Sequence, residues 1–141
     1  DCSVLLRFDN GARGVVLASQ IEVGELNGLR IRCYGDKGGI SWQQEQPNTL
    51  TFHHADGRTE LVRASDASLG PLASARTRTP GGHPEGYLEA FANIYRDFAA
   101  TLRGEDAPCL PGLTEGLRGM AFIDTAVRAS AARAGWIPLT V

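Results

Sequence analysis

Apolar and polar residues alternate with a period of two through much of the first half of the chain. The clearest case is "LRIRCYG", where Leu29, Ile31 and Cys33 fall on one side and Arg30, Arg32 and Tyr34 fall on the other. Segments of this kind predict six short strands, over residues 2–8, 12–19, 29–35, 40–45, 49–55 and 59–64. Two unlike faces are typical of an antiparallel sheet.

Turn residues separate these segments at the places where hairpins need them. Asn10-Gly11 lies between the first two strands, and both positions of such a turn tolerate a positive φ. Residues 65–82 are instead rich in Ser, Ala, Gly and Pro and show no period, which predicts an extended connection across the domain.

A helical period replaces the alternation after this connection. The first predicted helix has Pro84 at its first position and Gly104 just past its end. Its apolar residues form one continuous stripe, made of Tyr87, Phe91, Ile94, Tyr95, Phe98 and Leu102.

A second helix is predicted over residues 114–133, with Gly135 as its stop. One side of it carries Leu117, Met120, Ile123 and Val127. Gly116 and Gly119 lie inside it, and we expect another backbone to approach closely there, because glycine otherwise only weakens a helix. The closing "GWIPLTV" is predicted as a short edge segment, since Pro138 suits an edge.

Strands first and helices last indicate an α+β class. We expect one domain over residues 1–141, in which a mainly antiparallel open sheet of about six strands has two amphipathic helices packed on one face. This expected architecture resembles that of the C-terminal domain of glyceraldehyde-3-phosphate dehydrogenase. The sheet face that carries Arg30, Arg32 and Tyr34 then meets solvent or a partner.

Composition and charge exclude several classes of protein. A net charge of −2 and a pI near 5.9 argue against a general nucleic-acid binder or a binder of anionic membranes. No apolar run is long enough to span a bilayer, and no leader pattern opens the chain. Cys2, Cys33 and Cys109 are too widely spaced for a disulfide framework or a zinc site. They predict reduced, mostly buried thiols in a cytoplasmic protein.

The common catalytic and nucleotide-binding motifs are absent from the sequence. There is no GxGxxG after a strand, no GxxxxGK[ST], no GxSxG and no HExxH. The glycines of "GDKGG" lie between two strands and predict a turn. His53 and His54 are adjacent in a strand and point to opposite faces, so they do not form a metal pair. Asp97 and Asp124 are expected on solvated helix faces.

His83 is the strongest local candidate for a binding residue. Two glycines precede it, and the free N–H groups of the helix behind it favour polar ligand oxygens. The alternative is a loop or capping residue without a ligand. A hydrolase that uses His83 with Asp97 is disfavoured, because fourteen helical positions separate the two residues by roughly 20 Å.

Four segments together resemble the C-terminal domain of the Gfo/Idh/MocA oxidoreductases, which are nicotinamide-dependent sugar and inositol dehydrogenases. They are "LLRFDNGARGVVLASQ", "NGLRIRCYGDKGGISWQQEQPNTL", "GGHPEGYLEAFANIYRDF" and "LPGLTEGLRGMAFIDTAVRAS…GWIPL". Their order and spacing match the family over nearly the whole chain apart from residues 65–80. The segment "GHPEGYLEAFANIY" is similar to members that act on cyclic polyols or sugars.

The resemblance implies that part of the family's machinery lies outside this chain. Family members hold NAD or NADP in an N-terminal Rossmann domain and carry an Asp/His pair at the entrance to the second domain, and this sequence contains neither. The chain also opens in mid-strand at Asp1, without an initiator Met, so we expect a piece of a longer protein. No residue of this chain is then expected to be catalytic, to bind the cofactor or to ligate a metal.

By the same resemblance, His83 would hydrogen-bond a substrate hydroxyl, and Gln20 would lie at the substrate rim. The exposed sheet face would supply a homo-oligomer interface. The expected function is that of a substrate-binding and oligomerisation domain of an NAD(P)-dependent sugar or polyol dehydrogenase, inactive without its Rossmann domain. The alternative is a stand-alone, non-enzymatic dimerisation or sugar-binding module of the same fold.

Overall fold

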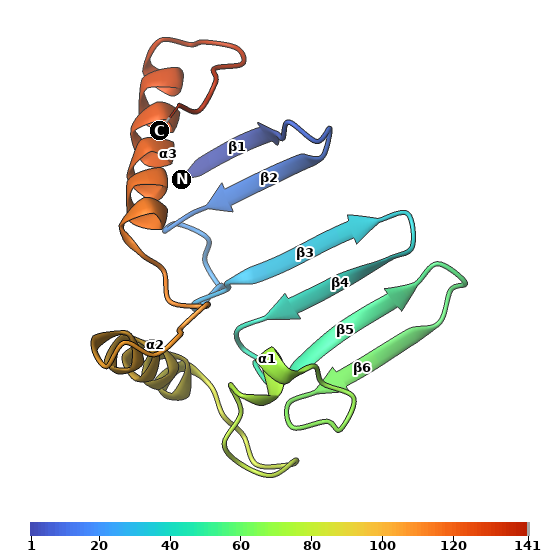
Figure 1. Ribbon diagram of the computed structural model, residues 1–141. Helices are drawn as coiled ribbons and strands as arrows, with labels where there is room; N and C mark the ends of the chain where they lie inside the picture. Colours follow the sequence, from blue (N-terminus) through green and yellow to red (C-terminus); the bar gives the residue numbers. More distant parts are fainter. Residues whose placement is uncertain (141) are drawn as a thin grey trace. The chain divides into compact units, whose positions relative to one another are not determined.

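The computed structural model describes residues 1–140, which fall into two compact units (Figure 1). One unit contains Asp1–Gly24 together with the chain from Cys109 onward, and the other contains Glu25–Pro108. The fold is α+β with six antiparallel strands, as the sequence predicts. The six strands are divided between two sheets and do not form one continuous sheet within the described residues.

The first unit contains a two-stranded hairpin and the last helix. Strand β1 (Cys2–Arg7) pairs with β2 (Arg13–Ala18), and the predicted turn around Asn10 joins them. The turn is closed by Phe8, whose N–H donates to the Ala12 carbonyl at 3.0 Å.

Helix α3 spans Leu113–Ala131. Residues 132–140, which follow it, contain no strand. The predicted edge segment is therefore wrong for the described residues. Val141 lies outside them. The Arg7 guanidinium lies over the ring of Trp136 in this tail, and the distance from Arg7 Cζ to the centroid of that ring is 3.7 Å.

The second unit contains a four-stranded meander in the order β3-β4-β5-β6. Its strands are Arg30–Gly35, Gly38–Gln43, Thr49–His54 and Thr59–Arg63. The register makes the two faces unlike, as expected from the alternation. One face carries Ile31, Ile40, Trp42, Leu50, Phe52 and Val62, and the other carries mainly polar residues that begin with Arg30 and Arg32.

Two helices follow the meander in the same unit. The predicted connection contains one short helix, α1 (Pro71–Ser74), and the long helix α2 spans Tyr87–Leu102. Pro84 is not at its first position, so that prediction is wrong. The helix begins after Gly86, whose N–H donates to the Glu89 carboxylate at 2.8 Å. Pro84 instead lies in the loop before the helix, next to Glu85.

Both long helices end in the same hydrogen-bonded stop. After α2, Gly104 has φ 76° as predicted, and the Glu105 N–H donates to the Ala100 carbonyl at 3.0 Å. After α3, the left-handed residue is Arg133 (φ 49°), and the Ala134 N–H donates to the Ala129 carbonyl at 3.0 Å. Gly135 is therefore not the stop of α3, because the turn closes two residues earlier.

This pair of stops gives a matched stability prediction. Gly104→Ala is expected to destabilise the protein by about 1 kcal/mol, because a side chain is strained at this positive φ. Arg133→Gly is expected to stabilise it by about as much, because glycine removes the same strain. Chemical denaturation of both variants checks the prediction, and effects of equal sign would contradict it.

Apolar side chains remain exposed on both units. No hydrophobic residue is fully buried within residues 1–140, and the stripes on α2 and α3 are exposed along their length. A Cβ at Gly116 or Gly119 would meet nothing within 4 Å, so the expected close backbone approach is not found in the described part.

The three cysteines are unpaired, as expected, but all are exposed and not buried. None of the described helices is long and apolar enough to cross a bilayer.

Candidate functional site

The loop that precedes α2 is held by a network centred on Glu85. Its carboxylate accepts hydrogen bonds from the backbone N–H groups of Arg78 (2.8 Å) and Thr79 (3.1 Å). Its own N–H donates to the Asn48 side chain of the β4–β5 turn at 3.0 Å. One residue thus joins the connection, the loop and the sheet, which fixes the backbone around residues 79–86.

His83 lies in this loop with an exposed side chain. Its Nδ1 is 3.1 Å from the Pro80 carbonyl oxygen, and its own carbonyl accepts from the Thr79 hydroxyl at 3.1 Å. A carbonyl only accepts, so Nδ1 is the donor in this contact, and in the neutral imidazole the lone pair is then on Nε2. Gly82, with φ 87°, allows the tight turn that orients the ring. The arrangement presents Nε2 as an acceptor for a hydroxyl.

Gln20 lies in the other unit, in the exposed stretch after β2. No hydrogen bond from its side chain is recorded among the described residues, so it is available to a ligand. His83 and Gln20 are each described within their own unit, and the geometry within the units does not bring them together.

The most buried charged group is Asp97 on α2, which is only 7% exposed. Its carboxylate pairs with Arg76, which lies just after α1, and with Arg96 at 3.4 Å. Arg96 also donates to the Ala75 carbonyl at 2.8 Å, and Asn93 donates to the Arg76 carbonyl at 3.1 Å. The expected solvated position of Asp97 is therefore wrong, because the connection folds back over this side of the helix.

The hydrogen bond from Arg76, which outweighs desolvation, holds the pKa of Asp97 below its ordinary value. The carboxylate is thus charged at neutral pH and acts as a fixed tether for the connection. Asp124, by contrast, is exposed as predicted and pairs with Arg128 at 2.8 Å on the surface of α3. The sequence signal for Asp97 is its place four residues after Asn93, which puts both polar side chains on one helix face.

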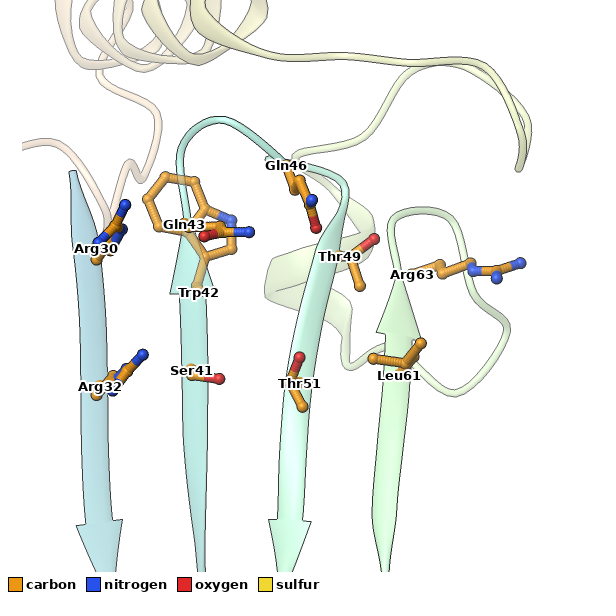
Figure 2. Close-up of a pocket in the computed structure, with 10 residues that line it drawn as sticks. All are labelled: Arg30, Arg32, Ser41, Trp42, Gln43, Gln46, Thr49, Thr51, Leu61 and Arg63. Atoms are coloured by element: carbon orange, nitrogen blue, oxygen red, sulfur yellow. The ribbon is translucent and has the colours of Figure 1, made fainter. Parts of the chain in front are cut away.

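A shallow groove of about 310 Å³ lies on the polar face of the four-stranded sheet (Figure 2). Ten residues line the groove, and the register arranges all of them except Trp42 and Gln46 in two rows across the strands. One row is Arg32, Ser41, Thr51 and Leu61, and the other is Arg30, Gln43, Thr49 and Arg63. Arg30 is paired with Glu25 at 3.0 Å. The sequence alternation predicts this face, but not that its residues enclose a groove.

Other candidate chemistry is not assembled within residues 1–140. His53 lies beside Thr59 (3.3 Å) and His54 beside Glu60 (3.0 Å), on opposite faces as expected. No group of metal-ligating side chains is found there. Gly35 and Gly38 flank the β3–β4 turn and pair with each other, so "GDKGG" is a hairpin and does not fit a dinucleotide phosphate. The described residues thus offer polar positions for binding and no nucleotide cradle.

Comparison with known proteins agrees with this arrangement. The family model described as "Oxidoreductase family, C-terminal alpha/beta domain" matches residues 1–139, and the chain belongs to this Gfo/Idh/MocA family. It is 34% identical to the uncharacterized oxidoreductase YfiI of Bacillus subtilis over 95% of its length, which is 36% of that protein.

Solved structures also match nearly the whole chain. An oxidoreductase from Sinorhizobium meliloti is 40% identical with a TM-score of 0.92, over 96% of this chain and 40% of that one. An inositol dehydrogenase homolog from Azotobacter vinelandii, complexed with NADH and myo-inositol, is 28% identical with a TM-score of 0.87, over 96% of this chain and 38% of that one. The chain thus spans about two fifths of the length of these relatives.

Proposed function

We propose that residues 1–141 form the substrate-binding and oligomerisation domain of a longer NAD(P)-dependent oxidoreductase that acts on a sugar or a cyclic polyol. The similarity to an inositol dehydrogenase homolog that binds NADH and myo-inositol carries this proposal. The rigid loop around His83 supports it, because a polyol is recognised by fixed hydrogen-bonding groups that match its hydroxyls.

In this proposal His83 accepts a hydrogen bond from a substrate hydroxyl, and Gln20 lies at the rim of the same site. NAD or NADP supplies the hydride acceptor from another domain, since the described residues contain no cradle for it. The chain by itself is then inactive. The unpaired thiols of Cys2, Cys33 and Cys109 fit a reducing compartment such as the cytoplasm.

The test uses the full-length protein encoded by the same gene. Reduction of NAD and of NADP is followed at 340 nm with myo-inositol, other cyclic polyols and hexoses as substrates. Activity that depends on one of them supports the proposal. A gene product without a nucleotide-binding domain, or a full-length protein that reduces neither cofactor with any of these compounds, would favour the stand-alone binding module.

The same proposal gives the polar sheet face a role in assembly. Its strands leave Arg32 and Tyr34 exposed, with Tyr34 retaining 77% of its accessible surface. A large exposed aromatic beside an arginine is typical of protein interfaces. We therefore assign the homo-oligomer contact to this face.

Charge reversal at this face tests the assignment. The double variant Arg30→Glu/Arg32→Glu is expected to lower the mass measured by light scattering toward that of a monomer, because it introduces carboxylates at the centre of the contact. The double variant Arg118→Glu/Arg128→Glu, at exposed positions of α3, is the charge-matched control. An unchanged mass in the sheet variant would exclude this interface.

A further inference from the structure

The groove on the polar sheet face contains arginines that lack a carboxylate partner. Arg32 and Arg63 have no carboxylate partner among the residues that the structure describes, and only Arg30 is neutralised, by Glu25. The two rows contain no acidic residue. This part of the surface is therefore cationic although the whole chain has a charge of −2.

Neutral donors lie next to the free arginine. Ser41 is the cross-strand neighbour of Arg32, and Thr51 follows on the next strand. Both side chains are half-buried in the groove, and neither has a recorded hydrogen-bond partner within residues 1–140. Figure 2 shows all three on one row across adjacent strands, while Arg63, at the end of the outermost strand β6, extends outward.

We propose that this groove binds a multivalent oxyanion, a phosphate or a polycarboxylate, through Arg32, Ser41 and Thr51. A guanidinium matches two oxygens of such an anion in a bidentate contact, and the two hydroxyls donate to the remaining oxygens. Arg63 adds to the positive potential at the far end. The volume of about 310 Å³ suits a small ion and is at the lower limit for larger ligands.

A bound anion also explains how this cationic face packs against the same face of a second copy of the protein. A two-fold contact places the same patch on both partners, so the unpaired arginines of one copy would approach those of the other. Like charges in such a contact oppose association unless counter-charge is present. An oxyanion bound in the groove supplies it, and linkage then requires assembly to strengthen anion binding. This linkage between assembly and anion binding rests on the proposed assembly role, whereas the anion site itself does not.

The test is calorimetric titration of the full-length protein with inorganic phosphate and, separately, with malonate, at constant ionic strength. We expect saturable binding of at least one probe, weakened at least tenfold by Arg32→Gln. Arg58→Gln is the matched control, because it removes the same charge from the exposed β5–β6 turn. Preference for one probe distinguishes a phosphate ligand from a carboxylate ligand.

Three results would overturn the anion site: no saturable binding of either probe, equal weakening by both variants, or binding that Arg32→Gln leaves unchanged. Equal weakening would indicate only the general ionic atmosphere. Light scattering of the unaltered protein and of the Arg30→Glu/Arg32→Glu variant separates this inference from the assembly proposal. If the anion binds but the Arg30→Glu/Arg32→Glu variant keeps the mass of the unaltered protein, the assembly assignment falls and the anion site stands.

Discussion

Asp97→Ala is expected to lower the midpoint of thermal unfolding by at least about 5 °C. Asp97 is 7% exposed, and its carboxylate pairs with Arg76 of the connection and with Arg96 of its own helix. Its removal leaves the Arg76 guanidinium, whose side chain is 24% exposed, without this partner. Removing one member of such a pair destabilises the protein, because the remaining guanidinium stays partly desolvated and loses this ion pair.

The pH dependence identifies the charge as the cause. Asp97 has its pKa lowered in the folded state, chiefly by the hydrogen bond from Arg76, so its stabilisation is complete above the ordinary value near 3.8 and is lost as the pH falls below it. Asp97→Asn removes the charge but keeps the shape. The difference in midpoint between Asp97→Asn and the unaltered protein should therefore be largest near neutral pH and shrink below about pH 4.

Asp124→Ala is the control for this experiment. Asp124 also pairs with an arginine on a helix, but its side chain is 67% exposed, and exposed pairs contribute little to stability. We expect almost no change in the midpoint for this variant. Equal effects of Asp97→Ala and Asp124→Ala would show that the Asp97 cluster does not fix the connection.

The sequence predicts local structure well here because local signals decide it. All six strands lie within two residues of their predicted bounds, since alternation and turn residues specify them. The sequence predicts the residue that ends α2 but not the residue that ends α3. A glycine at Gly104 is a strong stop signal, whereas Arg133 adopts the left-handed conformation without any residue preference that would announce it.

Long-range partners are the part that the sequence does not reveal. The burial of Asp97 depends on Arg76, twenty-one residues away in a segment with no period of its own. The same holds for Glu85, whose partner Asn48 lies in a turn thirty-seven residues earlier. Alternation places the residues of the sheet groove on one face, but the register between strands decides which of them are neighbours.

The sequence likewise does not reveal what covers the apolar stripes on α2 and α3. The helical period correctly predicts one apolar side on α2 and α3, yet these sides are exposed in the described residues. Apolar surface of this extent is typical of a region that packs against another protein or domain. A chain that spans about two fifths of its relatives' length is expected to have such surfaces.

His83→Ala is expected to lower kcat/KM of the full-length enzyme for its polyol or sugar substrate by about ten- to a hundredfold. The ring is oriented by the contact of Nδ1 with the Pro80 carbonyl at 3.1 Å, so Nε2 is the atom offered to a substrate hydroxyl. A substrate hydroxyl that loses its hydrogen-bond partner when bound costs about 1–3 kcal/mol, which sets the size of the loss.

The change is expected mainly in KM, because His83 is proposed to bind the substrate and not to take part in hydride transfer. His54→Gln is the matched control: His54 lies in β5 on the apolar face of the sheet, away from the loop, and glutamine keeps a donor for Glu60. A full-length His83→Ala enzyme with unaltered kinetics, or a loss matched by His54→Gln, would remove His83 from the substrate site. A loss confined to kcat would instead indicate that the ring acts on the reacting hydroxyl, and the proposed division of roles between the two domains would then be wrong.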